Sequence, residues 1–170
     1  QGMRVSSWVS SGVMKIVSSA VLVFTLCCSS VPEVDRPARS SSGSAVHWQA
    51  HDEDLIESAR QDGYPVILNF SADWCPPCHE LDEVTFSDPR VIESLNDFVM
   101  VKVDLTDWDT PESNELKRQY GVTGVPELHF LDLEGNEIQE LRVVGFLGPE
   151  YFLQRTAFAF ASARATLSMR

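Results

Sequence analysis

Two cysteines, Cys75 and Cys78, are separated by two residues and come directly after an apolar run at residues 66–70. If that run is a buried strand and Pro76 lies in the first turn of a helix, Cys75 lies at the helix N-terminus. Unpaired main-chain N–H groups favour a thiolate there. Cys78 then follows one helical turn later, within reach of a disulfide. The spacing predicts a redox-active pair, since a zinc site normally needs two further thiolate or histidine ligands.

The residues around the pair influence its direction of electron transfer. Pro76 and Pro77 have no main-chain N–H to donate, and acidic side chains surround the pair, so both features disfavour a thiolate at Cys75. The acidic residues are Asp73, Glu80, Asp82 and Glu83. His79 and the helix N-terminus act in the opposite direction. Because a less stabilised thiolate makes the reduced form less favoured, the balance predicts a reductant rather than a strong oxidant.

The elements on either side of the pair are predicted from local patterns. The run at residues 66–71 is a buried strand, and the helix from Pro76 should continue to about Val84. Residues 87–89, Ser-Asp-Pro, begin another helix with a capping residue and a first-turn proline. Residues 98–104 form a second buried strand, which is parallel to the first if the intervening helices are a crossover.

Further helices and a hairpin complete the predicted domain. We expect helices at residues 52–61 and 110–120, the second closed by Gly121. Residues 127–131 and 137–144 should form a hairpin, the antiparallel half of a mixed sheet. A last helix from Pro149 should present an apolar face, made of Tyr151, Phe152, Phe158 and Phe160. The fold class is α/β, with a mixed central sheet and helices on both faces.

The charge of the chain is unevenly distributed. Four basic and two acidic residues give residues 1–45 a net charge of +2, so the remainder carries −14 of the overall −12. Nucleic-acid binding needs a basic face that neutralises phosphates, so this class of function is excluded for the acidic part. We expect an export segment at residues 1–28, a flexible Ser- and Pro-rich tether at 29–45 and one folded domain at 46–170.

The export segment has a positive residue, Lys15, followed by an uncharged apolar run at residues 16–26. This run is short for a transmembrane helix, which takes about 20 residues. Cys27 and Cys28 follow it directly and resemble the lipidated cysteine of a bacterial lipoprotein signal. Simple signal cleavage and an uncleaved anchor are the alternatives. Each alternative places the domain outside the cytoplasm, in the periplasm, and lipidation would anchor it to the membrane.

A family resemblance rests on several motifs together. Residues 74–78, Trp-Cys-Pro-Pro-Cys, with a later Gly-Val-Pro at 124–126, resemble the thioredoxin superfamily. The Ala-Asp-Trp-Cys of 72–75, the Thr-Phe-Ser-Asp-Pro of 85–89 and the Val-Gly-Phe of 144–146 are most similar to the C-terminal periplasmic domain of the thiol:disulfide interchange reductase DsbD. The similarity covers about residues 48–160. It implies a thioredoxin fold and a protein-disulfide reductase that needs no cofactor.

The resemblance assigns roles to the motif residues. Cys75, the exposed member of the pair in the superfamily, would attack a substrate disulfide, and Cys78 would resolve the mixed disulfide. Pro126 would be a cis proline that leaves the main chain of Val125 free to pair with an extended substrate. Trp74 would form a surface wall beside Cys75. A fixed structural disulfide, and a trans Pro126 at the start of an edge strand, are the alternatives.

The proton acceptor for Cys78 is open, because Asn69 occupies the position where the family usually has a buried aspartate. Asp82, four residues after Cys78, matches an acidic position of the reductase domain and could take the proton, or could be a solvated helix residue. Lys102 matches a thioredoxin lysine near the same acid, and a salt-bridged or an exposed strand lysine fits equally well.

Partners and alternative functions complete the predictions. We expect disulfide-bearing substrate proteins and a separate membrane or soluble electron donor. One alternative is a disulfide oxidase or isomerase. An alternative from another class is a copper or zinc carrier, although the spacing of His47, His51, His79 and His129 matches no ligand motif and we predict no metal site.

Overall fold

The computed structural model describes residues 45–168, all of which lie in one compact unit, Ala38–Arg170. The predicted export segment at 1–28, the candidate lipidation sites Cys27 and Cys28, and the tether except for its last residue lie outside the described residues. None of the helices within residues 45–168 combines the length and the apolarity that a membrane crossing requires.

A five-stranded mixed sheet forms the centre of the domain, with strand order β1-β3-β2-β4-β5. β2 runs parallel to β3 and antiparallel to β4, so the predicted crossover and the predicted antiparallel half are both confirmed. β1 is parallel to β3, and β5 is antiparallel to β4. The strands are β1 (Gln49–Ala50), β2 (Val66–Ser71), β3 (Val99–Asp104), β4 (Glu127–Leu131) and β5 (Val143–Val144).

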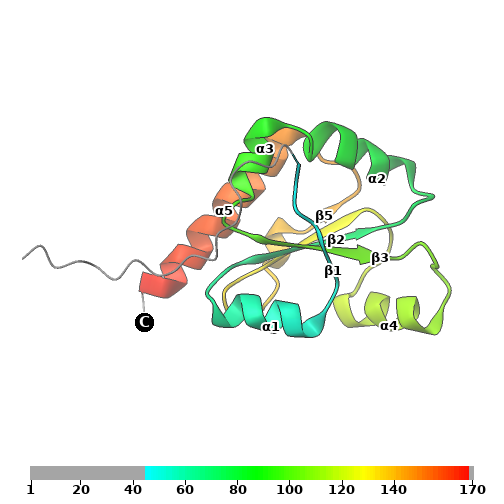
Figure 1. The fold of residues 1–170 in the computed structure, drawn as a ribbon, viewed down its shortest axis with the longest axis horizontal. Coiled ribbons are helices and arrows are strands. Elements are labelled where there is room, and N and C mark those ends of the chain that lie inside the picture. The colour runs from blue at the N-terminus through cyan, green and yellow to red at the C-terminus, as the bar shows by residue number, and fades with distance from the viewer. Residues whose placement is uncertain (1–44, 169–170) are drawn as a thin grey trace, which may run out of the picture. The chain divides into compact units, whose positions relative to one another are not determined.

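Helices cover both faces of the sheet, as Figure 1 shows, with α2, α3 and α5 on one face and α1 and α4 on the other. A π-helical turn, η1 (Leu81–Thr85), continues α2, so the predicted helix through Val84 is confirmed with a wider last turn. The helices are α1 (Glu53–Gln61), α2 (Pro76–Glu80), α3 (Pro89–Ser94), α4 (Pro111–Tyr120) and α5 (Pro149–Ser168). This arrangement confirms the predicted thioredoxin fold.

Two apolar cores, one on each face, hold the helices on the sheet. Alternate residues of β2 serve the two cores: Ile67 packs with the α2–α3–α5 layer, and Leu68 and Phe70 pack with the α1–α4 layer. β2 is buried along its whole length because it lies in the centre of the sheet. The strand therefore fixes the start of α2, which carries the cysteine pair.

Two local predictions were wrong in part. The strand expected at residues 137–144 contains a 3₁₀ turn, η2 (Gln139–Leu141), so β5 has only two residues, and Glu137 forms an isolated bridge with Leu131. On α5, Phe152 is fully buried, but Tyr151 and Phe158 are each 65% exposed. Only one side of the helix packs on the sheet, and the rings of Tyr151 and Phe158 are not on that side.

Candidate functional site

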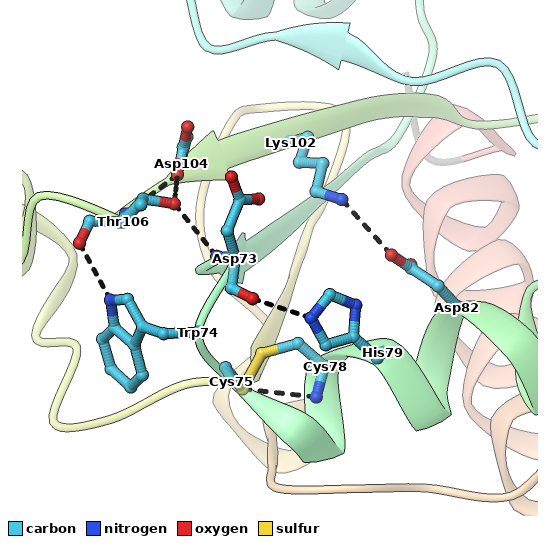
Figure 2. Close-up of a disulfide and its surroundings, with 9 residues drawn as sticks. All are labelled: Asp73, Trp74, Cys75, Cys78, His79, Asp82, Lys102, Asp104 and Thr106. Carbon is cyan, nitrogen blue, oxygen red and sulfur yellow. Dashed lines mark hydrogen bonds and ion pairs between the residues drawn. A yellow bond between two sulfur atoms is a disulfide. The ribbon is translucent and has the colours of Figure 1, made fainter.

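The cysteine pair forms a disulfide at the start of α2 (Figure 2), with the two Cα atoms 5.3 Å apart. Cys75 is the N-cap residue, and its Sγ accepts a hydrogen bond from the main-chain N–H of Cys78 over 3.2 Å. Pro76 and Pro77 occupy the first helical positions. A main-chain N–H has no intrahelical partner there, so the missing N–H groups of the two prolines cost no hydrogen bond. The predicted placement of the pair is confirmed.

Both cysteines are buried in the disulfide form. Cys75 is 2% exposed and Cys78 is 4% exposed, so the expectation that Cys75 is the exposed member of the pair is wrong for this form. The reason is local packing, because Ala72 and Val125 cover the disulfide. The chemistry at Cys75 therefore depends on the segments that surround it.

The first of these segments contains Pro126. The Val125–Pro126 peptide bond is cis, as predicted, and the Pro126 carbonyl accepts a hydrogen bond from the Gly145 N–H over 2.8 Å. Val125 is half-buried and its side chain packs against the disulfide. The structure thus brings Val125 and Pro126 to the disulfide, although the two cysteines lie 47 to 51 positions earlier in the chain.

Trp74 forms the exposed wall that was predicted beside Cys75, with 55% of its surface accessible. Its indole Nε1–H donates to the Thr106 carbonyl over 2.8 Å, and the Asp73 N–H donates to Thr106 Oγ1 over 3.0 Å (Figure 2). Trp108 contacts Trp74 edge to face, with ring centroids 6.1 Å apart. The wall is therefore held in place by the segment that follows β3.

Asp104 in turn fixes Thr106. Its Oδ1 accepts hydrogen bonds from the N–H and the hydroxyl of Thr106, over 2.8 and 2.6 Å. These bonds hold the pKa of the Asp104 carboxyl below its ordinary value. No role was predicted for this segment from the sequence, although the Asp-x-Thr at the end of a buried strand is a turn signal that could have indicated it.

The histidines do not converge on the disulfide. The Nε2–H of His79 donates to the Asp73 carbonyl over 2.7 Å, which joins the first turns of α2 to the segment that carries Trp74. Nε2 of His51 lies 3.0 Å from the Tyr120 hydroxyl, and Nε2 of His129 lies 3.1 Å from Glu127. Each of these side chains therefore has a structural contact of its own.

Asp82 and Lys102 form an ion pair beside the site, with Nζ and Oδ2 3.3 Å apart and each side chain slightly more than a third exposed. The Asp82 carboxylate points toward Lys102, further along the helix than the disulfide (Figure 2). Of the alternatives for Lys102, the salt-bridged lysine is confirmed. Asn69 is 1% exposed on β2, and no described residue donates a hydrogen bond to its Oδ1.

A buried polar pair lies behind the Pro126 segment. Glu127 and His129 are each 1% exposed, and burial alone would raise the pKa of the Glu127 carboxyl. Hydrogen bonds from Thr123, His129 and Gly124 outweigh the burial and hold that pKa below its ordinary value. Burial lowers the pKa of His129, against the opposing effect of Glu127. This pair was not predicted from the sequence, where the signal for it is a Glu and a His inside an apolar strand.

Most of the described domain matches a known protein family. A family model described as a thioredoxin-like domain matches residues 52–160. The thiol:disulfide interchange protein DsbD of Colwellia psychrerythraea is 34% identical over 128 residues, which are 75% of this chain and 21% of that protein. DsbD of Yersinia enterocolitica is 41% identical over 96 residues, 56% of this chain and 16% of that protein. The chain thus spans about a fifth of the length of these relatives.

Solved structures agree with the fold. A thioredoxin from Thermus thermophilus superposes with a TM-score of 0.61 at 28% identity, over 72% of this chain and 92% of that one. The oxidised C-terminal domain of DsbD from Neisseria meningitidis superposes with a TM-score of 0.52 at 26% identity, over 59% of this chain and 85% of that one. The similarity therefore concerns one domain of the longer relatives.

Proposed function

Because this chain belongs to the thioredoxin-like domain family, we propose that it is a thiol:disulfide oxidoreductase that reduces disulfides in partner proteins. The observation that carries the proposal is the Cys75–Cys78 disulfide at the start of α2, covered by Val125 and bordered by the exposed Trp74. The names of the DsbD relatives, thiol:disulfide interchange proteins, support the same chemistry.

The proposed reaction starts from the dithiol. The Cys75 thiolate attacks one sulfur of the substrate disulfide, a mixed disulfide forms, and the departing substrate sulfur takes up a proton. Cys78 then loses its proton and attacks Cys75 Sγ. The mixed disulfide breaks, the second substrate sulfur leaves and is protonated, and the Cys75–Cys78 disulfide forms. Two electrons and two protons pass to the substrate.

Two surrounding groups have proposed roles in this reaction. Asp82, which forms an ion pair with Lys102, would accept the Cys78 proton, since the side chain of Asn69 cannot. Trp74 and the main chain of Val125 would contact an extended segment of the substrate. Trp74 suits this role because it is exposed and yet held by Thr106 and Trp108.

The proposed setting is the periplasm. A lipid at Cys27 or Cys28 would anchor the chain to the membrane, and residues 29–45 would let the domain reach its partners. The oxidised pair must receive two electrons before the next turnover, so the setting requires a dithiol donor, either soluble or in the membrane.

A trapping experiment tests the activity. The reduced chain should reduce insulin in the presence of a thiol donor, and Cys75→Ser should abolish this activity. Cys78→Ser should instead accumulate a mixed disulfide with the substrate, because the resolving thiol is missing. Wild-type chain that leaves insulin oxidised, or a Cys75→Ser variant that retains activity, would refute the proposal.

The direction of electron flow is tested separately by the reduction potential. A reductase should lie near the value of thioredoxin, about −270 mV, and far from the value of a strong oxidant, about −120 mV. Equilibration of the chain with glutathione of known redox ratio gives this value. A result close to that of the oxidant would instead favour an oxidase or isomerase.

A further inference from the structure

Glu127 directly follows the cis proline and begins β4, and its side chain is 1% exposed. A carboxylate is almost never buried completely unless its oxygens are paired. The reaction proposed above does not use this group. Its partners therefore indicate what a charged side chain does inside the domain, directly behind the disulfide-facing segment.

One oxygen of Glu127 binds the segment that leads to the cis proline. Oε1 accepts hydrogen bonds from the Thr123 N–H over 2.8 Å, from the Thr123 hydroxyl over 3.0 Å and from the Gly124 N–H over 3.2 Å. Hydrogen bonds to an ionised carboxylate are about twice as strong as those between neutral groups. Glu127 therefore fastens the two residues that directly precede Val125.

The other oxygen connects Glu127 to the interior of the domain. The Nε2–H of His129 donates to Oε2 over 3.1 Å, because a carboxylate oxygen can only accept. Arg142 Nη1 lies 3.9 Å from the same oxygen. The ring of His129 packs against Phe70 of the central strand, with centroids 4.7 Å apart. The fastening point is thus held by the core.

Arg142 fastens the beginning of the same segment. Its guanidinium donates to the carbonyls of Tyr120 and Gly121, each over 3.2 Å, at the C-terminal end of α4. Glu137 holds the guanidinium through two further bonds, of 2.7 and 2.6 Å. Residues 120, 121, 123 and 124 are therefore bound to one charged cluster, whose Glu127 and His129 are buried and whose Glu137 and Arg142 are half-buried.

Val125, the next residue, differs from its neighbours. Within the described part of the chain, its main-chain N–H and C=O have no hydrogen-bond partner, while its side chain packs against the disulfide. An extended peptide could use both main-chain groups, as in strand addition. Such pairing is tighter when the direction of these groups is already fixed before the peptide binds, because less freedom is then lost on binding.

We propose that Glu127 is a positioning residue, which holds residues 123–125 so that the main chain of Val125 can pair with an extended segment of the substrate protein. This inference rests on the proposed reductase function and names the recognised chemistry: the peptide main chain beside the substrate disulfide. Glu127 is buried and its two oxygens bond to Thr123, Gly124 and His129, so its effect should appear in substrate binding and not in the exchange step.

Two variants of Glu127 separate the hydrogen bonds from the charge. Glu127→Leu fills the site but removes every acceptor, so KM for insulin should rise at least fivefold while kcat changes less than twofold. Glu127→Gln keeps an acceptor oxygen for Thr123 and Gly124, so its KM should stay within twofold of wild type. Hydroxyethyl disulfide has no peptide main chain, and the rate of its reduction should not change in either variant.

Thr123→Val and Glu137→Gln provide the second variant and the control. Thr123→Val removes only the hydroxyl bond, so it should fold even if Glu127→Leu does not, and KM for insulin should rise about twofold. Glu137→Gln loosens Arg142, which binds the carbonyls of residues 120 and 121, but leaves the bonds from Glu127 to Thr123 and Gly124 intact. Its KM for insulin should therefore rise less than that of Glu127→Leu, with kcat unchanged.

The outcomes are distinct for the inference and for the reductase function. Wild-type chain that cannot reduce insulin refutes the reductase function itself. Active wild type with an unchanged KM in folded Glu127→Leu, or in Thr123→Val if Glu127→Leu does not fold, refutes the positioning role. Equal losses with insulin and with hydroxyethyl disulfide also refute it, because they indicate a general structural defect.

Discussion

The indole Nε1–H of Trp74 donates to the main-chain carbonyl of Thr106 over 2.8 Å, although Trp74 is 55% exposed. An exposed aromatic ring that is already held in place loses little freedom when a partner binds. Trp108 adds an edge-to-face contact, and the Lys117 ammonium lies 3.9 Å from the centre of the Trp108 ring. The exposed wall beside the disulfide is therefore preorganised by residues that lie more than 30 positions later in the chain.

Replacing Trp108 tests this preorganisation. Trp108→Ala removes a ring contact of the kind worth about 0.5–1.5 kcal/mol, so KM for insulin should rise between about twofold and about tenfold, with kcat nearly unchanged. Steady-state kinetics measure the effect. Trp48→Ala is a suitable control, because Trp48 packs edge to face on Phe86 in the other core. Equal effects of the two substitutions on KM would contradict a specific role for Trp108.

Substitutions at Asp82 and Lys102 separate the effect of the Asp82 carboxylate on the reaction from the effect of the ion pair. General-base catalysis is typically worth at least about a hundredfold, so Asp82→Asn should slow the resolution of a mixed disulfide by at least about tenfold. Because each partner is more than a third exposed, the free energy of unfolding should change by no more than about 1 kcal/mol. Quenched-flow alkylation of the mixed disulfide gives the rate.

Lys102→Met is the matched control for this prediction. It removes the same ion pair but retains the Asp82 carboxylate, so the resolution rate should remain within about twofold of wild type, far from the loss expected for a missing general base. If Lys102→Met slows resolution as much as Asp82→Asn does, the ion pair and not the carboxylate carries the effect. If neither variant slows it, another group takes the Cys78 proton.

The lowered pKa of His129 predicts how the stability of the domain depends on pH. Burial lowers the pKa of His129 in the folded chain below its ordinary value of 6.5, against the opposing hydrogen bond to Glu127. The unfolded chain therefore binds a proton at a higher pH than the folded chain does. This contribution to the free energy of unfolding is fully present above the unfolded pKa and is lost as the pH falls through the folded pKa. The slope is at most about 1.4 kcal/mol per pH unit.

Urea unfolding at about pH 7.5, 6.5 and 5.5 measures this slope. His129→Gln retains an N–H that can donate to Glu127 but has no group that titrates in this range, so its slope should be smaller. The lowered pKa values of the carboxyls of Glu127 and Glu137 produce losses only below their ordinary value of 4.5, outside this window. An equal slope in wild type and variant would assign the proton uptake to another group.

The sequence predicted the parts of the fold that depend on local signals. Capping residues and first-turn prolines placed the starts of α2, α3 and α4, and continuous apolar runs placed β2 and β3. The motif at 74–78 and the resemblance together also predicted the site around Cys75, including Pro126. Each of these signals depends on residues only a few positions apart, so it can be recognised in a single sequence without knowledge of the fold.

Long-range contacts were not predictable in the same way. The hydrogen bonds that Thr106 accepts from Asp73 and Trp74 join segments about 30 residues apart, and no pattern within either segment specifies the other. In the sequence, Glu127 is a polar residue in an apolar strand. Its role could not be predicted from that, because the role depends on partners that only the fold brings together. The burial of Cys75 likewise depends on Val125, 50 residues later in the chain.

Helix α5 gives a test in which two phenylalanines of one helix behave differently. Phe152 is completely buried and contacts Phe86 edge to face, with centroids 5.4 Å apart, whereas Phe158 is 65% exposed. Phe152→Ala should lower the free energy of unfolding by about 3–5 kcal/mol, because it removes a ring from a packed core. Phe158→Ala should change it by less than about 0.5 kcal/mol. Urea unfolding of both oxidised variants measures the difference, and a comparable loss from Phe158→Ala would mean that this ring is buried in the folded protein.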